Sequence, residues 1–259
     1  MCSIFAILGI SSDPRLLRKQ ALTQSKRQRH RGPDWSGIFL GQSAVLVHER
    51  LAIVDVEHGS QPLVSADGEL ALAVNGEIYN HQVLKELLNN DYDFQTASDC
   101  EVILALYREK GSELLSELNG MFAFVLYDAT TDSYLVARDP IGIIPLYYGY
   151  DAHGQLQVAS ELKALEGFCQ TIEIFPPGHY LDSREAEIKP YYQPGWIDYH
   201  MVADKTSSTS VIRESLTQAV KRHLMTDVPY GVLLSGGLDS SIIAALVKQF
   251  DDQRIEDDG

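Results

Sequence analysis

The sequence is poor in cysteine, in basic residues and in long apolar runs, and each shortage excludes a class of protein. Its 259 residues include three cysteines, Cys2, Cys100 and Cys169, which are widely spaced and form no Cys-x-x-Cys pair. This is neither a disulfide framework nor a zinc site, so we expect a reducing cytoplasm. Lys and Arg total 21 against 36 Asp and Glu, a formal net charge of −15. A nucleic-acid surface requires clustered Lys and Arg, so this charge argues against one.

No apolar run reaches the length of about 20 residues that a helix needs to cross a bilayer. The run at residues 4–10 has no basic segment before it and no cleavage site after it, which makes it a poor signal peptide. The histidines show no His-Glu-x-x-His or similar ligand spacing. We therefore expect no membrane partner and no histidine metal site.

Strand patterns dominate the chain up to residue 181. The candidates are residues 3–8, 44–51, 69–74, 121–127, 134–137, 146–150 and 157–159, with further short strands within 172–181. Asp67-Gly68 is a hairpin turn signal before the third of these. Runs of strands with few helices between them indicate antiparallel sheets with helices packed outside, which is an α+β fold.

Two helices are predicted among these strands. Asp13-Pro14 opens the first, because a capping side chain is followed by proline in the first turn. The second covers residues 98–110, with Ser98 and Glu101 as a capping box and Gly111 as the stop.

A polar, irregular stretch at residues 190–210 marks a boundary, so we predict domains at residues 1–195 and 206–259. Beyond it the pattern predicts a helix at 211–224, a buried strand at 228–234, a glycine turn and a helix from Ser240. That order is typical of the start of an α/β nucleotide-binding domain. One such unit cannot bury a parallel sheet by itself, so we expect the second domain to be incomplete.

Cys2 follows Met1, and removal of Met1 would place a thiol and a free α-amino group on one residue. An α-amino group has a pKa of roughly 7.7–8.0, so a useful fraction is neutral at physiological pH. It can take the thiol proton and later hand a proton to a leaving amine. By itself, a cysteine at this position is weak evidence, because chance or a small buried side chain explains most cases.

The motifs that accompany Cys2 make the pattern specific. The apolar run after Cys2, then RHRGPDWSG from Arg29, HERLAIVD from His48, NGEIYNH from Asn75 and SDCE from Ser98 resemble the class II glutamine amidotransferases. These are N-terminal-nucleophile hydrolases, and the resemblance implies their sandwich of two antiparallel sheets between helices. NGEIYNH, with ARDPIGIIPLYY and ASELKAL, is similar to the glutamine-hydrolysing asparagine synthetases in particular. The resemblance extends from Cys2 to the end of the chain.

The oxyanion of amide hydrolysis requires preorganised donors, which the side-chain amide of Asn75 and the backbone N–H of Gly76 can supply. The alternative is a plain Asn-Gly hairpin turn. Arg50 suits a bidentate grip on the α-carboxylate of glutamine, or it is an exposed strand arginine.

Acidic residues are candidates for the α-ammonium group of glutamine. Asp99 can pair with it, although an acid in the first turn of a helix is favoured whatever the function. Glu77 can do the same, or merely flank the turn. The resemblance implies that the following residues hold glutamine: Arg50, Ile53, Val54, Asn75, Gly76, Glu77 and Asp99.

The segment Ser235-Gly236-Gly237-Leu238-Asp239-Ser240-Ser241 follows the second domain's predicted strand and opens its helix. Glycines leave backbone N–H groups free to converge on phosphate oxygens, and the helix N-terminus adds its positive end. No Walker A pattern occurs. The loop looks like the SGGxDS loop of the ATP pyrophosphatases, which implies Mg²⁺ on Asp239 and adenosine against Leu233, with Ser235, Gly236, Gly237 and Ser240 also at the ATP. A serine–glycine helix cap is the alternative.

The resemblance implies an ATP-dependent ligase that makes asparagine from aspartate. It also implies that glutamine is hydrolysed through a thioester on Cys2 without a cofactor, and that the ammonia travels inside the protein to an aspartyl-adenylate made with ATP and Mg²⁺. Because the second domain is expected to be incomplete, we expect this chain to retain only the glutaminase half. The alternatives are a relative with another acceptor, such as a peptide or antibiotic precursor, and a non-catalytic glutamine sensor. The sequence does not fix the oligomeric state, and a homodimer is one option.

Overall fold

A computed structural model of the chain describes residues 2–88, 91–185 and 187–258, with side chains to residue 251. The chain divides into two compact units, Met1–Gln193 and Pro194–Gly259, and each is taken by itself below. Among the described residues, no helix combines the length and the apolar character that a membrane span requires.

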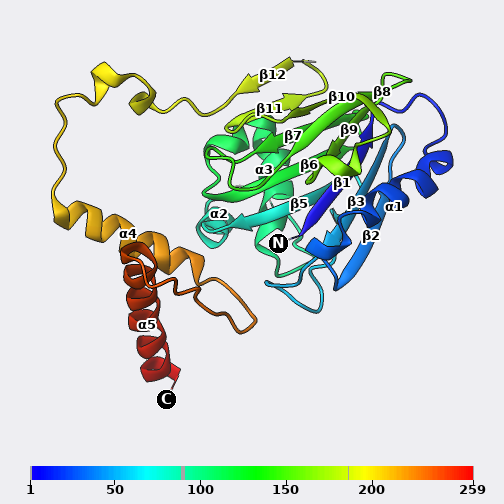
Figure 1. Cartoon of the computed structure of the whole chain (residues 1–259). Coiled ribbons are helices and arrows are strands. Elements are labelled where there is room, and N and C mark those ends of the chain that lie inside the picture. The colour runs from blue at the N-terminus through cyan, green and yellow to red at the C-terminus, as the bar shows by residue number, and fades with distance from the viewer. Residues whose placement is uncertain (1, 89–90, 186, 259) are drawn as a thin grey trace. The chain divides into compact units, whose positions relative to one another are not determined.

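The first unit contains two six-stranded sheets in which every strand pair is antiparallel (Figure 1). The first sheet has the order β10-β8-β9-β1-β3-β2 and the second β12-β11-β7-β6-β5-β4. The strands are β1 (Ser3–Leu8), β2 (Trp35–Leu40), β3 (Ala44–Arg50), β4 (Leu63–Val64), β5 (Leu70–Ile78), β6 (Gly120–Asp128), β7 (Ser133–Arg138), β8 (Tyr147–Asp151), β9 (Leu156–Ala159), β10 (Cys169–Ile174), β11 (His179–Asp182) and β12 (Glu187–Pro190). The predicted α+β class with antiparallel sheets is confirmed.

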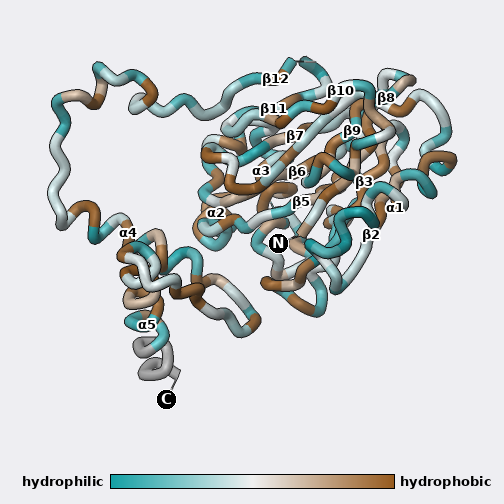
Figure 2. The backbone as a smooth tube through the Cα atoms, in the orientation of Figure 1, coloured by the Kyte–Doolittle hydropathy of each residue, from teal (hydrophilic) through white to brown (hydrophobic). Residues whose placement is uncertain are grey.

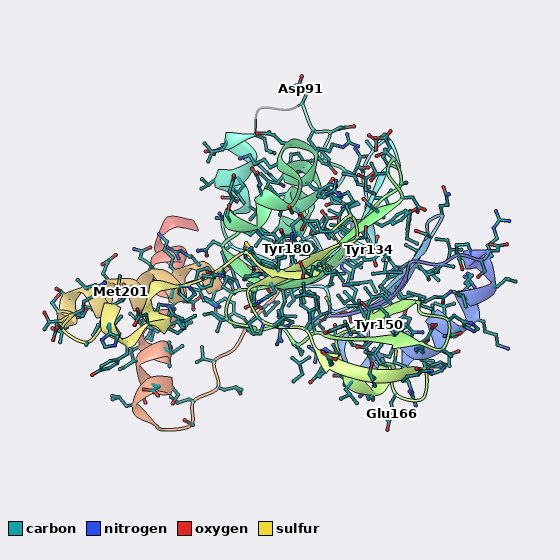
Figure 3. All side chains as sticks on the ribbon, turned by 90° about the horizontal axis from the view of Figure 1, so that it is seen from above. Asp91, Tyr134, Tyr150, Glu166, Tyr180 and Met201 are labelled. Carbon is teal, nitrogen blue, oxygen red and sulfur yellow. The ribbon has the colours of Figure 1, made fainter. Side chains whose placement is uncertain are left out.

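Successive side chains of a strand point to opposite faces of its sheet, and this alternation explains how the two sheets and the outer helices pack. Along β1, Ile4, Ala6 and Leu8 belong to the apolar cluster shared by the two sheets, whereas Phe5 and Ile7 face α1 (Arg18–Lys26) on the outside. Figure 2 shows apolar residues along the inner strands and hydrophilic residues on α1. Seen from above in Figure 3, side chains crowd the interior of this unit.

The outer face of the second sheet is covered in the same way. A third apolar cluster joins its strands to α3 (Val102–Lys110) and α2 (His81–Leu87). Every residue from Val102 to Tyr107 is buried, because α3 packs between the sheet and the segments that flank it.

The helix ends differ in detail from the prediction. Asp13 accepts a hydrogen bond from Arg15 N at 2.9 Å, but the chain first makes a 3-10 turn, Pro14–Leu17, before α1. Of the predicted capping box, the Ser98 cap is present, because Ser98 Oγ accepts from Cys100 N at 3.3 Å. The predicted role of Glu101 is wrong, because its carboxylate accepts from backbone N–H groups of the segment before Ser98. A further 3-10 turn, Asp99–Glu101, precedes α3, and Gly111 ends that helix at φ +56°.

Among the described residues, three strands and one α-helix were not predicted, namely β2, β4, β12 and α2. They are short or lie at sheet edges, where tertiary contacts decide the conformation more than local propensity does. In β2, for example, a Cβ on Gly37 would lie 1.9 Å from Gln61 O, so this glycine permits a contact that the sequence pattern does not reveal.

The second unit contains two helices, α4 (Thr209–His223) and α5 (Leu238–Asp258), preceded by 3-10 turns at Gly195–Ile197 and Tyr199–Met201. The predicted strand at residues 228–234 is wrong: this stretch is irregular, and Leu233 is 96% exposed. A buried parallel strand requires neighbouring strands for its backbone groups, and no strand occurs among residues 194–258.

Limited trypsin digestion tests this division of the chain. Lys205 lies exposed in the irregular stretch before α4, so we expect early cleavage there and a resistant fragment that contains the first unit. Mass spectrometry of the products identifies the cuts, and Lys205→Gln is expected to delay the first of them. Equally fast cleavage within residues 2–193 would contradict the assignment of a compact first unit.

Candidate active site

A cavity of about 50 Å³ in the first unit brings together every residue predicted for the glutamine site. Its lining consists of Cys2, Arg50, Leu51, Ile53, Val54, Gly59, Gln61, Asn75, Gly76, Glu77, Ser98, Asp99, Cys100, Met121 and Ile144. These residues come from the position before β1, the end of β3 and the loop after it, the end of β5, the start of β6, the loop before β8 and the turn before α3. The cavity therefore depends on both sheets.

Cys2 lies directly before β1 and is held on both its backbone and its side chain. Leu51 N donates to Cys2 Sγ at 3.3 Å, and Arg31 Nε donates to the Cys2 carbonyl at 3.0 Å. Burial raises the pKa of the Cys2 thiol, although the Leu51 N–H opposes this. The thiol is thus protonated at neutral pH and requires a base. The predicted removal of Met1 concerns a residue outside the described ranges.

Asn75 and Gly76 lie inside β5, opposite Ala123 and Phe122 of β6, so the hairpin-turn alternative is wrong. The Asn75 side chain is buried, and within the described residues neither its oxygen nor its nitrogen has a hydrogen-bond partner. A buried amide without a partner costs free energy, which a ligand in the cavity can recover.

The N–H of Gly76 points to the edge of β5 that lies away from β6. On this edge Val74 N donates to Gln61 Oε1 at 2.8 Å, and Ile78 N donates to Asp99 Oδ2 at 2.6 Å. Alternate residues of a strand direct their N–H groups to the same edge. The Gly76 N–H therefore lies between these two bonds, in a wall of the cavity.

Gly76 cannot carry a side chain in this arrangement. A Cβ would lie 2.1 Å from Met121 O and 2.6 Å from Phe122 Cα, and the residue adopts φ +151°. Glycine is thus the residue that lets β5 approach β6 here while its N–H faces the cavity.

Arg50 ends β3 and is 6% exposed, so the exposed-arginine alternative is wrong. Its guanidinium donates to the carbonyls of Val54 (3.1 Å), Asp55 (2.6 Å) and Val56 (3.0 Å) in the following loop. Three of its five N–H groups are used in this way, which leaves two for a ligand. Arg50 supplies the positive charge of the cavity.

Two carboxyl groups supply negative charge at another part of the cavity. Asp99 is 3% exposed, and burial raises its pKa, although the Ile78 N–H opposes this. Burial, with the nearby Asp99 carboxylate, raises the pKa of Glu77 to about 7. A molecule with one anionic and one cationic end fits this combination of Arg50 and two acids.

Two residues at or near the cavity had no predicted role. Gln61 lines the cavity and binds Val74 N, whereas Asp55, which does not line it, lies at the end of the HERLAIVD motif and accepts from Ala97 N at 2.9 Å. Both act through backbone groups far away in sequence, a contact that no local pattern reveals. Cys100 is 2% exposed and also lines the cavity, with Sγ 3.6 Å from Gly76 O.

The predicted ATP-site residues lie together in the second unit, in the first turn of α5 and in the loop before it. Ser235 Oγ and Ser240 Oγ are 2.9 Å apart, Gly237 N donates to Ser235 Oγ at 3.4 Å, and Gly236 has φ +83°. These bonds fit a serine–glycine helix cap as well as a phosphate loop. No group of three or more His, Cys, Asp or Glu suited to a metal occurs in the described part of the chain.

Another cavity in the second unit, of about 920 Å³, is lined by residues 226–232 and by part of α5. None of the predicted ATP-site residues lines it, so the structure does not link it to nucleotide binding.

Comparison with known proteins identifies relatives for both units. A family model described as glutamine amidotransferase domain matches residues 1–174, and one described as asparagine synthase matches residues 211–256. The chain is 58% identical to asparagine synthetase B (glutamine-hydrolysing) of Escherichia coli (strain K12), over 99% of this chain and 46% of that protein. It is 48% identical to a probable glutamine-hydrolysing asparagine synthetase of Dictyostelium discoideum, over 99% and 47%. The chain thus spans about half the length of these relatives.

Solved structures show the same fold. A glutamine phosphoribosylpyrophosphate amidotransferase from B. subtilis, complexed with ADP and GMP, aligns with a TM-score of 0.61 at 26% identity, over 74% of this chain and 50% of that one. A structure described as the allosteric regulatory enzyme of purine biosynthesis aligns with a TM-score of 0.62 at the same identity and coverage. The predicted N-terminal-nucleophile hydrolase sandwich is confirmed.

Replacing Gly76 tests the close approach of β5 and β6. We expect Gly76→Ala to lower the free energy of unfolding by about 2 kcal/mol or more, because the new Cβ forces Met121 O to move. Gly154→Ala is the control: its φ is +76° but nothing lies within 4 Å of the added Cβ, so about 1 kcal/mol is expected. Urea denaturation measures both, and equal losses would show that the steric explanation is wrong.

Proposed function

Since this chain belongs to the glutamine amidotransferase domain family, we propose that its first unit hydrolyses glutamine to glutamate and ammonia, with Cys2 as nucleophile. The observation that carries the proposal is the buried, unpartnered amide of Asn75 in the cavity that Cys2 also lines.

The reaction proceeds through a thioester. The Cys2 sulfur attacks the side-chain amide carbon of glutamine, and its proton passes to the Cys2 α-amino group once Met1 has been removed. Asn75 and the Gly76 N–H donate to the oxyanion that forms. The α-amino group then gives its proton to the leaving nitrogen, ammonia departs, and water hydrolyses the γ-glutamyl thioester to glutamate.

The rest of the cavity recognises the amino-acid part of glutamine. Arg50 binds the α-carboxylate with its two remaining N–H groups, and Asp99 and Glu77 bind the α-ammonium group. Ile53 and Val54, from the loop that follows Arg50, line the cavity. This assignment uses both signs of charge present there.

For the second unit we propose the start of a synthetase domain, with domains at residues 1–195 and 206–259. The match of residues 211–256 to the asparagine synthase family supports it. The whole protein would use ATP and Mg²⁺ to activate aspartate and combine it with the released ammonia. In this chain Ser235, Gly236, Gly237 and Ser240 would contact ATP, Leu233 the adenosine, and Asp239 the metal.

Two other functions are alternatives to the proposed one. A relative with the same plan but another acceptor would share the glutaminase site and differ in its acceptor residues. A non-catalytic glutamine sensor would bind glutamine without releasing glutamate. A homodimer and a cytoplasmic location stay predictions, the latter resting on three free cysteines.

Loss of the Cys2 thiol is the direct test of the proposed reaction. We expect the purified chain to release glutamate from glutamine and Cys2→Ala to lose at least roughly 10³-fold in rate, because no nucleophile remains. Cys169→Ala, which removes a thiol from β10 outside the cavity, is the matched control and should keep the wild-type rate. Glutamine binding without glutamate release by the wild-type chain would favour the sensor.

The raised pKa of Glu77 predicts a pH dependence. A carboxyl group with a pKa of about 7 carries its charge above that pH, so the KM for glutamine should fall as pH rises through about 7. Glu77→Gln cannot ionise, so its KM should be higher above pH 7 and lack this step. Steady-state kinetics measure the KM for glutamine against pH in both proteins. If the fall in KM near pH 7 persists in Glu77→Gln, this explanation is wrong.

A further inference from the structure

The two ends of the proposed glutamine site lie on segments that are far apart in sequence. Arg50, the last residue of β3, directly precedes the loop at residues 51–60, whereas Asp99 follows the segment at residues 92–98. Neither segment has regular secondary structure. No sheet ladder joins these two segments to each other, so the direct connection between them depends on side-chain contacts.

Asp55 makes such a contact from the Arg50 loop. Its side chain is largely buried, and Oδ2 accepts from Ala97 N at 2.9 Å, two residues before Asp99. Oδ1 accepts from His58 N at 3.2 Å within the loop itself. One carboxylate thus joins both walls of the cavity.

The backbone of Asp55 fixes the other end of the site. Its carbonyl accepts from Arg50 Nη2 at 2.6 Å and from Gly59 N at 2.9 Å. Its φ of +50° is uncommon for a residue with a side chain, and Asp and Asn tolerate it best. The same residue therefore holds the guanidinium of Arg50 and the segment that carries Asp99.

The contact on the Asp99 side belongs to a row of backbone donors bound by carboxylates. Glu101 accepts from Gln95 N and Thr96 N, each at 2.7 Å, and Asp55 accepts from the next N–H, that of Ala97. Glu101 lies in the same segment of chain as its donors and shapes that segment internally. Asp55 comes from the opposite wall, so its bond fixes the distance across the cavity.

We propose that Asp55 is a positioning residue that sets the distance between Arg50 and Asp99, and thereby makes the site selective for a free α-amino acid with both charged groups. The inference rests on the proposed glutamine hydrolysis. Asp55 does not line the cavity and acts through the two residues it holds. Selectivity follows because an amide without an α-ammonium group gains nothing from a correctly placed Asp99.

Asp55→Asn is the test variant, since asparagine tolerates the positive φ but cannot accept both N–H groups with the same strength. Glutamine is compared with glutaramate, the same amide without the α-ammonium group, by glutamate or glutarate release. We expect the KM for glutamine to rise roughly tenfold or more and that for glutaramate to change little. The wild-type preference for glutamine should shrink accordingly.

His58→Ala is the matched control, because the His58 ring is exposed and only pairs with Asp55 Oδ1 at 3.6 Å, while its backbone bond remains. Its kinetics should equal those of the wild type. Asp55→Gly, which also accepts the positive φ, should reproduce Asp55→Asn.

Each remaining outcome is decisive. A wild-type chain that releases no glutamate refutes the proposed function itself. An active wild type with an Asp55→Asn variant that weakens both substrates equally, or fails to fold, overturns the inference, because Asp55 would then serve stability rather than selectivity.

Discussion

The packing of one sheet on the other is the constraint on which the site depends, because the proposed nucleophile and the proposed oxyanion donors belong to different sheets. His48 on β3 bridges them directly: its Nε2 donates to the carbonyl of Val74, next to Asn75, at 2.9 Å. Burial lowers the pKa of His48 to about 3, so the ring is neutral and Nε2 carries the proton that this bond requires. The apolar cluster between the sheets keeps water from competing with this bond.

Burial in the folded chain shifts the pKa values of two groups in and near the site in opposite directions. The pKa of Glu77 is raised from its usual value of 4.5 to about 7, so its contribution to stability falls as pH rises from about 4.5 to about 7. His48 has the opposite sign, because its pKa is depressed below 6.5 and its contribution falls as pH drops below that value. Together with the unpaired Asn75 amide, the partly buried Glu77 makes an empty site costly. A ligand with an ammonium group and a carbonyl oxygen offsets part of that cost.

Sequence patterns predicted much of the fold, including β1 at residues 3–8, the sheet class and the gathering of the site residues. They placed Asn75-Gly76 in a motif but left open whether it was a turn, because strand pairing with β6 is set by residues nearly fifty positions away. Asp55 went unassigned since its partner, Ala97, offers a backbone N–H that any residue would have. The strand predicted at 228–234 fails for a related reason: local apolar character does not make a strand without neighbours to pair with.

The shortness of β4 has a consequence for the whole second sheet. It pairs only with Leu72 and Ala71 of β5, and Pro62, directly before it, has no N–H with which to continue the ladder. The rest of that margin is covered by side chains, Gln61 on one flank and Asp99 on the other. A longer, more regular β4 would pair with the rest of this edge of β5, and its carbonyls would accept from the Gly76 N–H. The Gly76 N–H is available to a ligand because the edge strand ends before it.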